Sequence, residues 1–139
     1  MKIINESIKI ARELFPAAHA SRKGYRTYHF CFAWDKNRLL AIGQNYPDKP
    51  SAKAMKFAKK FQDRDKMKYP YLCAETDCLS KMYGRYYIGP DTKVVVIRLN
   101  SRGELQNSKP CRACDRILRA FDTEVWYSTA SGKIVRDGR

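Results

Sequence analysis

The chain has 139 residues, 44% of them hydrophobic, and a formal net charge of +14. This length supports one hydrophobic core and is too short for two ordinary domains, so we expect a single domain over residues 1–139. No apolar run approaches membrane-spanning length, and charges in the segment MKIINESIKIARELF exclude a signal-peptide core. We therefore expect a cytoplasmic protein without membrane contact. The charge favours polyanions or phosphorylated substrates, with an ordinary basic protein as the alternative.

The first half of the chain predicts a helix, a hairpin and a basic insert. Apolar residues at helical spacing predict a helix over residues 3–15, which Pro16 should end. The segments YHFCFAWD (28–35) and RLLAIGQN (38–45) are two residues apart and predict a β-hairpin. Residues 46–69 hold eight basic residues against three aspartates, and apolar residues spaced i, i+3, i+4, i+7. We expect this insert to contain a short amphipathic helix with a basic face.

The second half alternates helices and strands. KVVVIRLN is apolar enough to lie at the centre of a sheet, and residues 101–110 should form its exit loop. The last two strands are only three residues apart, which is too few for a parallel crossover, so they must be antiparallel. The pattern predicts an α/β fold of three α/β/α layers with a mixed five-stranded sheet. The predicted elements are a helix at 73–83, a strand at 93–100, a helix at 110–121, and strands at 123–129 and 133–137.

Three cysteines are candidate metal ligands. The odd total of five, with a CxxC among them, favours metal or redox use over disulfides. Cys111 and Cys114 lie on one side of a helix's first turn, and Cys73 opens another helix. Helix N-termini favour anions and should lower the pKa of these thiols. Three thiolates from two helix ends leave the fourth position of a tetrahedral zinc ion open, as in catalytic sites.

Glu75 is the candidate acid and base. Residues two apart point away from each other in a regular helix, so Glu75 and Cys73 converge only if the metal lies beyond the helix end. A carboxylate beside a zinc-activated water can take its proton and later pass it to a leaving amine.

The segments CAE (73–75) and PCRAC (110–114) together resemble the signature of the zinc-dependent cytidine deaminase superfamily, which is His or Cys, any residue, Glu, then PCxxC. The predicted order of strands and helices extends this resemblance from Tyr28 to Val135. It implies one Zn²⁺ per chain on Cys73, Cys111 and Cys114, with Glu75 carrying the proton. It also implies hydrolytic loss of ammonia from a base such as cytosine, giving uracil.

Two other interpretations of the cysteines remain open. The CxxC alone is also typical of a thioredoxin-like redox pair, although such a pair has no use for Cys73 or Glu75. A structural zinc would need a fourth ligand from Cys78 or Cys31, but their positions in a helix and a strand favour core thiols. His19 and His29 have no ligand spacing, and we interpret them as ordinary loop and strand residues.

The resemblance also suggests substrate contacts. The segment GQN (43–45) matches the superfamily's Gly-x-Asn, whose Asn usually binds the sugar, so Asn45 is a candidate for that role; a turn Asn needed for its backbone is the alternative. Pro47 stands where free cytidine deaminases have a sugar-binding Glu, which argues against a free nucleoside. Thr76 stands where they commonly have Arg. Our hypothesis is that Arg112 or Lys109 compensates the charge of the thiolates.

Further candidates surround the motif. Lys53, Lys56 and Lys60 share one stripe of the predicted basic helix and are candidate nucleic-acid contacts, with a solvated face as the alternative. The aromatic rings of Tyr46, Tyr69 and Tyr71, which are close to this helix in the sequence, could equally stack on bases or pack in the core. The candidate substrate-binding residues are Asn45, Tyr46, Tyr71, Ala74, Ser108 and Lys109.

The predicted function is deamination of cytosine in single-stranded DNA or RNA. The charge of the insert and the absence of the sugar-binding Glu favour that substrate. Cytosine nucleotides such as CMP or dCMP are the second choice, and adenine in tRNA is less favoured. A non-catalytic zinc module that binds nucleic acid is the alternative from another class, and both a monomer and an oligomer are compatible with the sequence.

Overall fold

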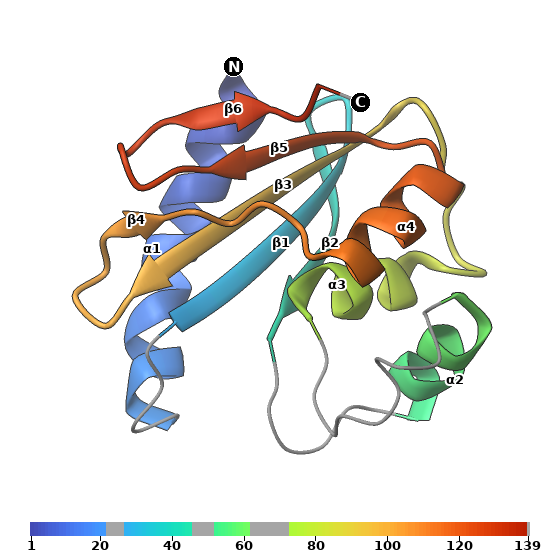
Figure 1. Cartoon of the computed structure of the whole chain (residues 1–139), viewed down its shortest axis with the longest axis horizontal. Coiled ribbons are helices and arrows are strands. Elements are labelled where there is room, and N and C mark those ends of the chain that lie inside the picture. The colour runs from blue at the N-terminus through green and yellow to red at the C-terminus, as the bar shows by residue number, and fades with distance from the viewer. Residues whose placement is uncertain (22–26, 46–51, 62–72, 139) are drawn as a thin grey trace.

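The computed structural model describes residues 1–21, 27–45, 52–61 and 73–138. Within them the chain forms one six-stranded sheet with helices on both faces (Figure 1). The helices are α1 (Lys2–Ser21), α2 (Ala52–Phe61), α3 (Ala74–Met82) and α4 (Arg112–Ala120). The strands are β1 (Thr27–Asp35), β2 (Arg38–Gln44), β3 (Thr92–Asn100), β4 (Leu105–Gln106), β5 (Glu124–Ser128) and β6 (Ile134–Arg136).

The sheet is mixed and has β3 at its centre. Its strand order is β2-β1-β3-β5-β6. β3 pairs antiparallel with β1 and parallel with β5, while β5 and β6 are antiparallel, as their short connection predicted. Because both edges and both faces of β3 are covered, Val94, Val95, Val96 and Ile97 are all fully buried. The central position predicted for this strand is confirmed.

The prediction of five strands was wrong by one. β4 lies inside the predicted exit loop, where Leu105 and Gln106 pair antiparallel with Leu99 and Arg98 beyond the end of β5. The turn between β3 and β4 uses Gly103 at a φ of 78°, which glycine adopts without strain. Two residues are too few to show the alternating pattern by which a strand is detected, so the sequence carried no signal for β4.

Alternate residues of β1 belong to two different cores. Phe30 and Phe32 face α1, whereas Cys31 and Ala33 face α3 and α4. In Figure 1, α1 lies behind the sheet while α3 and α4 lie in front of it. These three layers confirm the predicted α/β/α architecture.

α1 does not end at Pro16. The helix continues to Ser21 with the proline ring exposed. A proline inside a helix removes one hydrogen bond and costs about 3 kcal/mol. Packing on both sides of it offsets this cost, because Ala18 is buried and the ring of Phe15 meets Tyr28 edge-on at 5.2 Å. His19, expected in a loop, therefore lies in α1.

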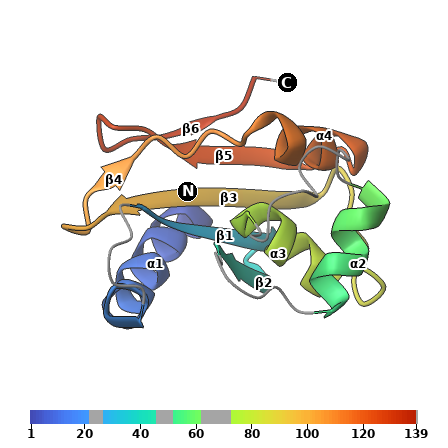
Figure 2. The same cartoon turned by 60° about the horizontal axis from the view of Figure 1, so that its bottom comes forward.

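The amphipathic helix predicted inside the insert is present as α2, and it packs beside α3 (Figure 2). Its apolar side buries Ala54, Phe57 and Ala58. The flanking parts of the insert, residues 46–51 and 62–69, lie outside the described residues. Among the helices that are described, none is long and apolar enough to cross a membrane.

Candidate metal centre and active site

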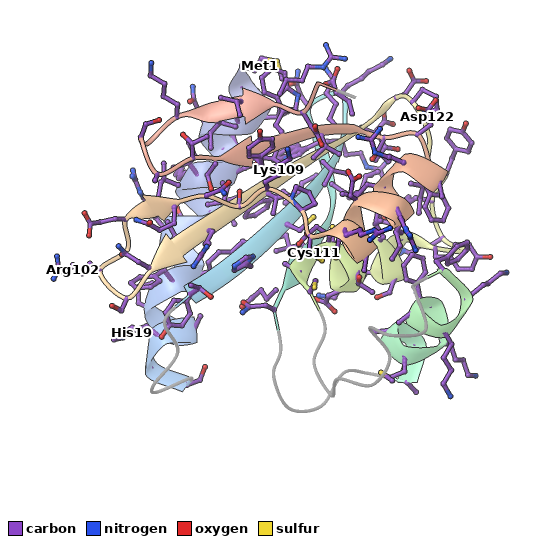
Figure 3. All side chains as sticks on the ribbon, viewed as in Figure 1. Met1, His19, Arg102, Lys109, Cys111 and Asp122 are labelled. Atoms are coloured by element: carbon purple, nitrogen blue, oxygen red, sulfur yellow. The ribbon has the colours of Figure 1, made fainter. Side chains whose placement is uncertain are left out.

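Three thiols meet where two helices begin. The sulfur atoms of Cys73, Cys111 and Cys114 all lie within 4.8 Å of one another. Cys73 and Cys111 are the residues just before α3 and α4, and both have extended backbone, with ψ of 153° and 166°. Their side chains therefore lie off the helix ends, as the convergence of Cys73 with Glu75 required. Figure 3 shows Cys111 at the start of α4, facing the first turn of α3.

The size of this cluster fits a zinc ion. A tetrahedral Zn²⁺ with Zn–S bonds of about 2.3 Å holds its thiolates about 3.8 Å apart. The observed separations of up to 4.8 Å need only a small inward movement of the side chains. Thiolates are the ligands that soft metals such as zinc prefer. Among the described residues, this is the one group of three or more metal-binding side chains.

Two of the three thiols have raised pKa values. The pKa of Cys73 is raised to about 12, mainly by its hydrogen bond with Cys111, then by burial and the charge of Glu75, while a hydrogen bond with Cys114 acts in the opposite direction. The pKa of Cys114 is raised well above its usual range by hydrogen bonds with Cys111 and Cys73 and by burial. The lowering of thiol pKa that we expected from the helix ends is thus outweighed. A divalent cation at the centre of the group would allow all three thiols to ionise.

Glu75 is buried beside the thiols. Its side chain is in the first turn of α3, and only 4% of the residue is exposed. Its charge contributes to raising the pKa of both Cys73 and Cys114. A buried carboxylate is costly unless it has a compensating partner. A cation held by the three thiols would compensate this charge, and a carboxylate in that position could transfer protons.

Thr76 contacts the cluster of three thiols, which the sequence did not predict. The residue is fully buried, and its hydroxyl oxygen lies 3.7 Å from the sulfur of Cys114. In the sequence, Thr76 is notable only as the residue at a position where free cytidine deaminases commonly have an arginine. Arg112, which we expected to compensate charge, is exposed, and so is Lys109, whose backbone N–H donates to Asn107 Oδ1. The charge role of Arg112 and Lys109 remains a prediction.

Gly43 and Asp77 fix α3 against the sheet. A Cβ at Gly43 would overlap the carbonyl oxygen of Ala74 and lie 2.7 Å from Cys78 Cβ, so α3 packs directly on the β2 backbone. Asp77, which the sequence did not single out, accepts a hydrogen bond from Gln44 N at 3.0 Å. These contacts set where α3 begins and hence where the thiol of Cys73 lies.

The predicted substrate contact Asn45 binds backbone. Its Oδ1 accepts from His29 N at 2.9 Å, and its Nδ2 donates to Thr27 O at 3.5 Å. The side chain therefore extends the pairing of β1 and β2. Its role in binding a sugar stays a prediction, as does a substrate contact for Ala74, which is buried.

Ser108 anchors the segment that leads into the second half of the motif. Its hydroxyl donates to Val96 O at 2.7 Å and accepts from Ser128 N at 2.7 Å. The residue is only 2% exposed. This network joins the loop before Cys111 to β3 and β5, so Ser108 positions the metal-binding segment. A direct contact with substrate stays a prediction for it.

His29 lies closer to the site than its sequence context suggested. It pairs with Arg98 across β1 and β3, and the guanidinium of Arg98 donates to Asn107 O at 3.2 Å. Burial, and then the charge of Arg98, lower the pKa of His29 to about 4, while Cys111 acts in the opposite direction. The imidazole is consequently neutral at physiological pH.

The remaining candidates divide into three groups. Lys53, Lys56 and Lys60 are exposed on α2, as predicted. Cys31 in β1 and Cys78 in α3 are fully buried in the same core, and neither belongs to the cluster of three thiols, so their interpretation as core thiols is confirmed. Tyr46 and Tyr71 lie outside the described residues.

Comparison with known proteins identifies the fold. No protein-family profile matches the sequence, and no curated protein matches it. The structure is similar to apo dCMP deaminase from the cyanophage S-TIM5, with a TM-score of 0.55 and 19% identity, covering 91% of this chain and 82% of that chain. Cytidine deaminase from Mycobacterium leprae gives a TM-score of 0.47 and 17% identity, covering 90% and 88% of the two chains. The first likeness and the α/β/α architecture give the chain a cytidine-deaminase-like fold.

Proposed function

We propose that the protein is a zinc-dependent deaminase that hydrolyses the amino group of cytosine. The observation that carries this proposal is the cluster of three thiols at the starts of two helices, with buried Glu75 in the first turn of the helix that Cys73 precedes. Cys73, Cys111 and Cys114 would hold Zn²⁺ and leave one coordination position for the reaction. A structural zinc site would instead need a fourth protein ligand, and Cys31 and Cys78 are in the core.

The residues of the chain divide the chemistry between them. Zn²⁺, when bound, supplies the Lewis acidity that makes water nucleophilic at neutral pH. The Glu75 carboxylate accepts the proton that the attacking water loses and delivers it to the departing amine. Thr76 directs its hydroxyl at Cys114, and the burial of both residues keeps bulk water from this side of the site.

The reaction is tested by product formation. The zinc-loaded protein is incubated separately with cytidine, CMP, dCMP and cytosine-containing oligonucleotides, and uracil is quantified. Glu75→Gln keeps the size of the side chain and removes the base, so we expect it to retain zinc and to lose at least about a hundredfold in rate. A Glu75→Gln protein as active as wild type would show that this carboxylate is not the proton carrier.

Single-stranded DNA or RNA is our first choice of substrate. The net charge of +14 and the exposed lysines of α2 support a polyanion. Free cytosine nucleotides are the second candidate, supported by the structural likeness to a dCMP deaminase. If uracil forms only from CMP or dCMP and not in oligonucleotides, single-stranded nucleic acid is rejected as the substrate, while the proposed deaminase reaction still holds.

A further inference from the structure

A small groove lies between α2 and the C-terminal half of α3. Its volume is about 240 Å³, and it is lined by Lys53, Lys56, Phe57, Lys60, Ser80 and Tyr83. We propose that this groove binds the nucleotides that flank the reacting cytosine in a single strand of DNA or RNA. The inference rests on the proposed function and specifies its substrate as a polynucleotide.

The groove has an unbalanced positive charge. Lys53, Lys56 and Lys60 follow one another at i, i+3 and i+7, so their ammonium groups share one face of α2. α2 contains four lysines and no acidic residue, and no ion pair joins these lysines to a carboxylate in the described part of the chain. Like charges at this spacing destabilise a helix, and bound phosphates would relieve that repulsion.

Aromatic rings lie between these charges. Phe57 is 3% exposed and Tyr83 is 37% exposed, so the tyrosine presents part of its ring to solvent. The ammonium of Lys60 donates a hydrogen bond to Tyr83 Oη at 2.6 Å and lies 5.1 Å from the centre of the same ring. Lys60 is thereby held in a defined position. Cations beside an accessible ring are the combination that binds phosphates and stacks bases of a single strand.

The distance from the thiols determines which part of the substrate reaches the groove. Tyr83 follows Cys73 by ten residues, so the two lie about 15 Å apart along the axis of α3 at 1.5 Å per residue. A strand with its cytosine at the thiols reaches the groove through neighbouring nucleotides. Turnover of a mononucleotide should therefore be independent of the groove, and that of an oligonucleotide should depend on it.

Binding is tested with fluorescent oligo-dT and oligo-U of about 15 nucleotides, which contain no cytosine. The full-length, zinc-loaded protein is compared with the groove variant Lys53→Gln/Lys56→Gln/Lys60→Gln. Its matched control, Lys2→Gln/Lys9→Gln/Lys133→Gln, removes the same charge from exposed lysines on α1 and in the β5–β6 turn. The groove variant should bind at least about tenfold more weakly than the control, and the slope of log affinity against log salt should shrink by about 2. Equal losses in the two triple variants would overturn the proposal.

Tyr83 provides a second, independent measurement. Tyr83→Ala should weaken oligonucleotide binding by about tenfold because a stacking ring is lost, whereas Tyr83→Phe should keep most of the affinity. Poly-glutamate of similar length should displace the oligonucleotide poorly. If it competes equally well, or if Tyr83→Ala binds as tightly as wild type, the groove is not a nucleic-acid site. Because the probes contain no cytosine, failure of this binding is distinguishable from failure of the deaminase reaction.

Discussion

The hydroxyl oxygen of Thr76 lies 3.7 Å from the sulfur of Cys114, and both residues are buried. A hydroxyl that donates to a thiolate spreads its negative charge and orients its lone pairs. A group of three thiolates carries excess charge even with a divalent cation bound. In this protein a neutral hydroxyl group therefore contacts a sulfur at the position where free cytidine deaminases commonly have an arginine.

Replacing Thr76 by Val should weaken zinc binding. The substitution keeps the shape of the side chain and removes the hydrogen bond, so we expect zinc affinity to fall by about tenfold to a hundredfold. Competition with a chromogenic chelator measures this change. Thr76→Ser retains the hydroxyl and should stay near wild type; if Val and Ser bind zinc equally well, the contact has no influence on the metal.

Replacing Gly43 by Ala should destabilise the fold and the site together. The added methyl group overlaps the backbone of α3, and such overpacking costs about 1–3 kcal/mol. Urea unfolding measures the loss, and the displacement of Cys73 should also lower zinc affinity. Gly138→Ala is the control, because nothing lies within 4 Å of a Cβ at that position. Equal stability of the two variants would contradict the close packing of α3 on β2.

Two aspartates allow a test of whether the burial of an ion pair or its length contributes more to stability. Asp77 pairs with Lys81 at 3.2 Å, and Asp115 pairs with Arg119 at the shorter distance of 2.7 Å. The Asp77 side chain is only 8% exposed, against 30% for Asp115, and Asp77 also accepts from Gln44 N. We expect Asp77→Asn to cost about 1–3 kcal/mol in urea unfolding and Asp115→Asn to cost less than about 0.5. The reverse order would mean that ion-pair distance outweighs burial.

His29 should make the protein less stable in mild acid. Its pKa is about 4 in the folded chain, against an ordinary value of 6.5, so the unfolded chain binds more protons between these two pH values. Stability should therefore fall as the pH decreases from 7, by about 2 kcal/mol at pH 5, and this contribution should level off below about pH 4. Urea unfolding of His29→Gln should show a flatter pH dependence. If the free energy of unfolding of His29→Gln depends on pH as steeply as that of wild type, other groups cause the acid sensitivity.

The sequence predicted those features that depend on local pattern. The valine run of β3 and the three-residue connection of β5 and β6 were enough to place the centre and one edge of the sheet. The packing of α1 could not be foreseen, because the proline signal at Pro16 is local while the contact of Phe15 with Tyr28 is tertiary. β4 was missed because two residues show no alternation. The single domain with a basic insert remains a prediction.

The sequence likewise predicted only part of the candidate site. CAE and PCRAC predicted that three cysteines would meet, and their sulfur atoms do so. The partners of those residues left no trace in the sequence, because Thr76, Asp77 and His29 contact their neighbours only after folding. Asn45 was chosen from a motif as a sugar contact, and its hydrogen bonds to the backbone of Thr27 and His29 could not be predicted from that motif.

The starts of α3 and α4 bring together Cys73 and Cys111, which are 38 residues apart in the sequence (111 minus 73). A metal ion shared by their thiolates would act as a removable cross-link that closes this long loop only in the folded chain, so the free energy of metal binding would add to the free energy of folding. Folding and metal loading would then be one equilibrium. Cells with little available zinc would accumulate less of the folded protein, so its abundance would report on the metal supply before any substrate is turned over.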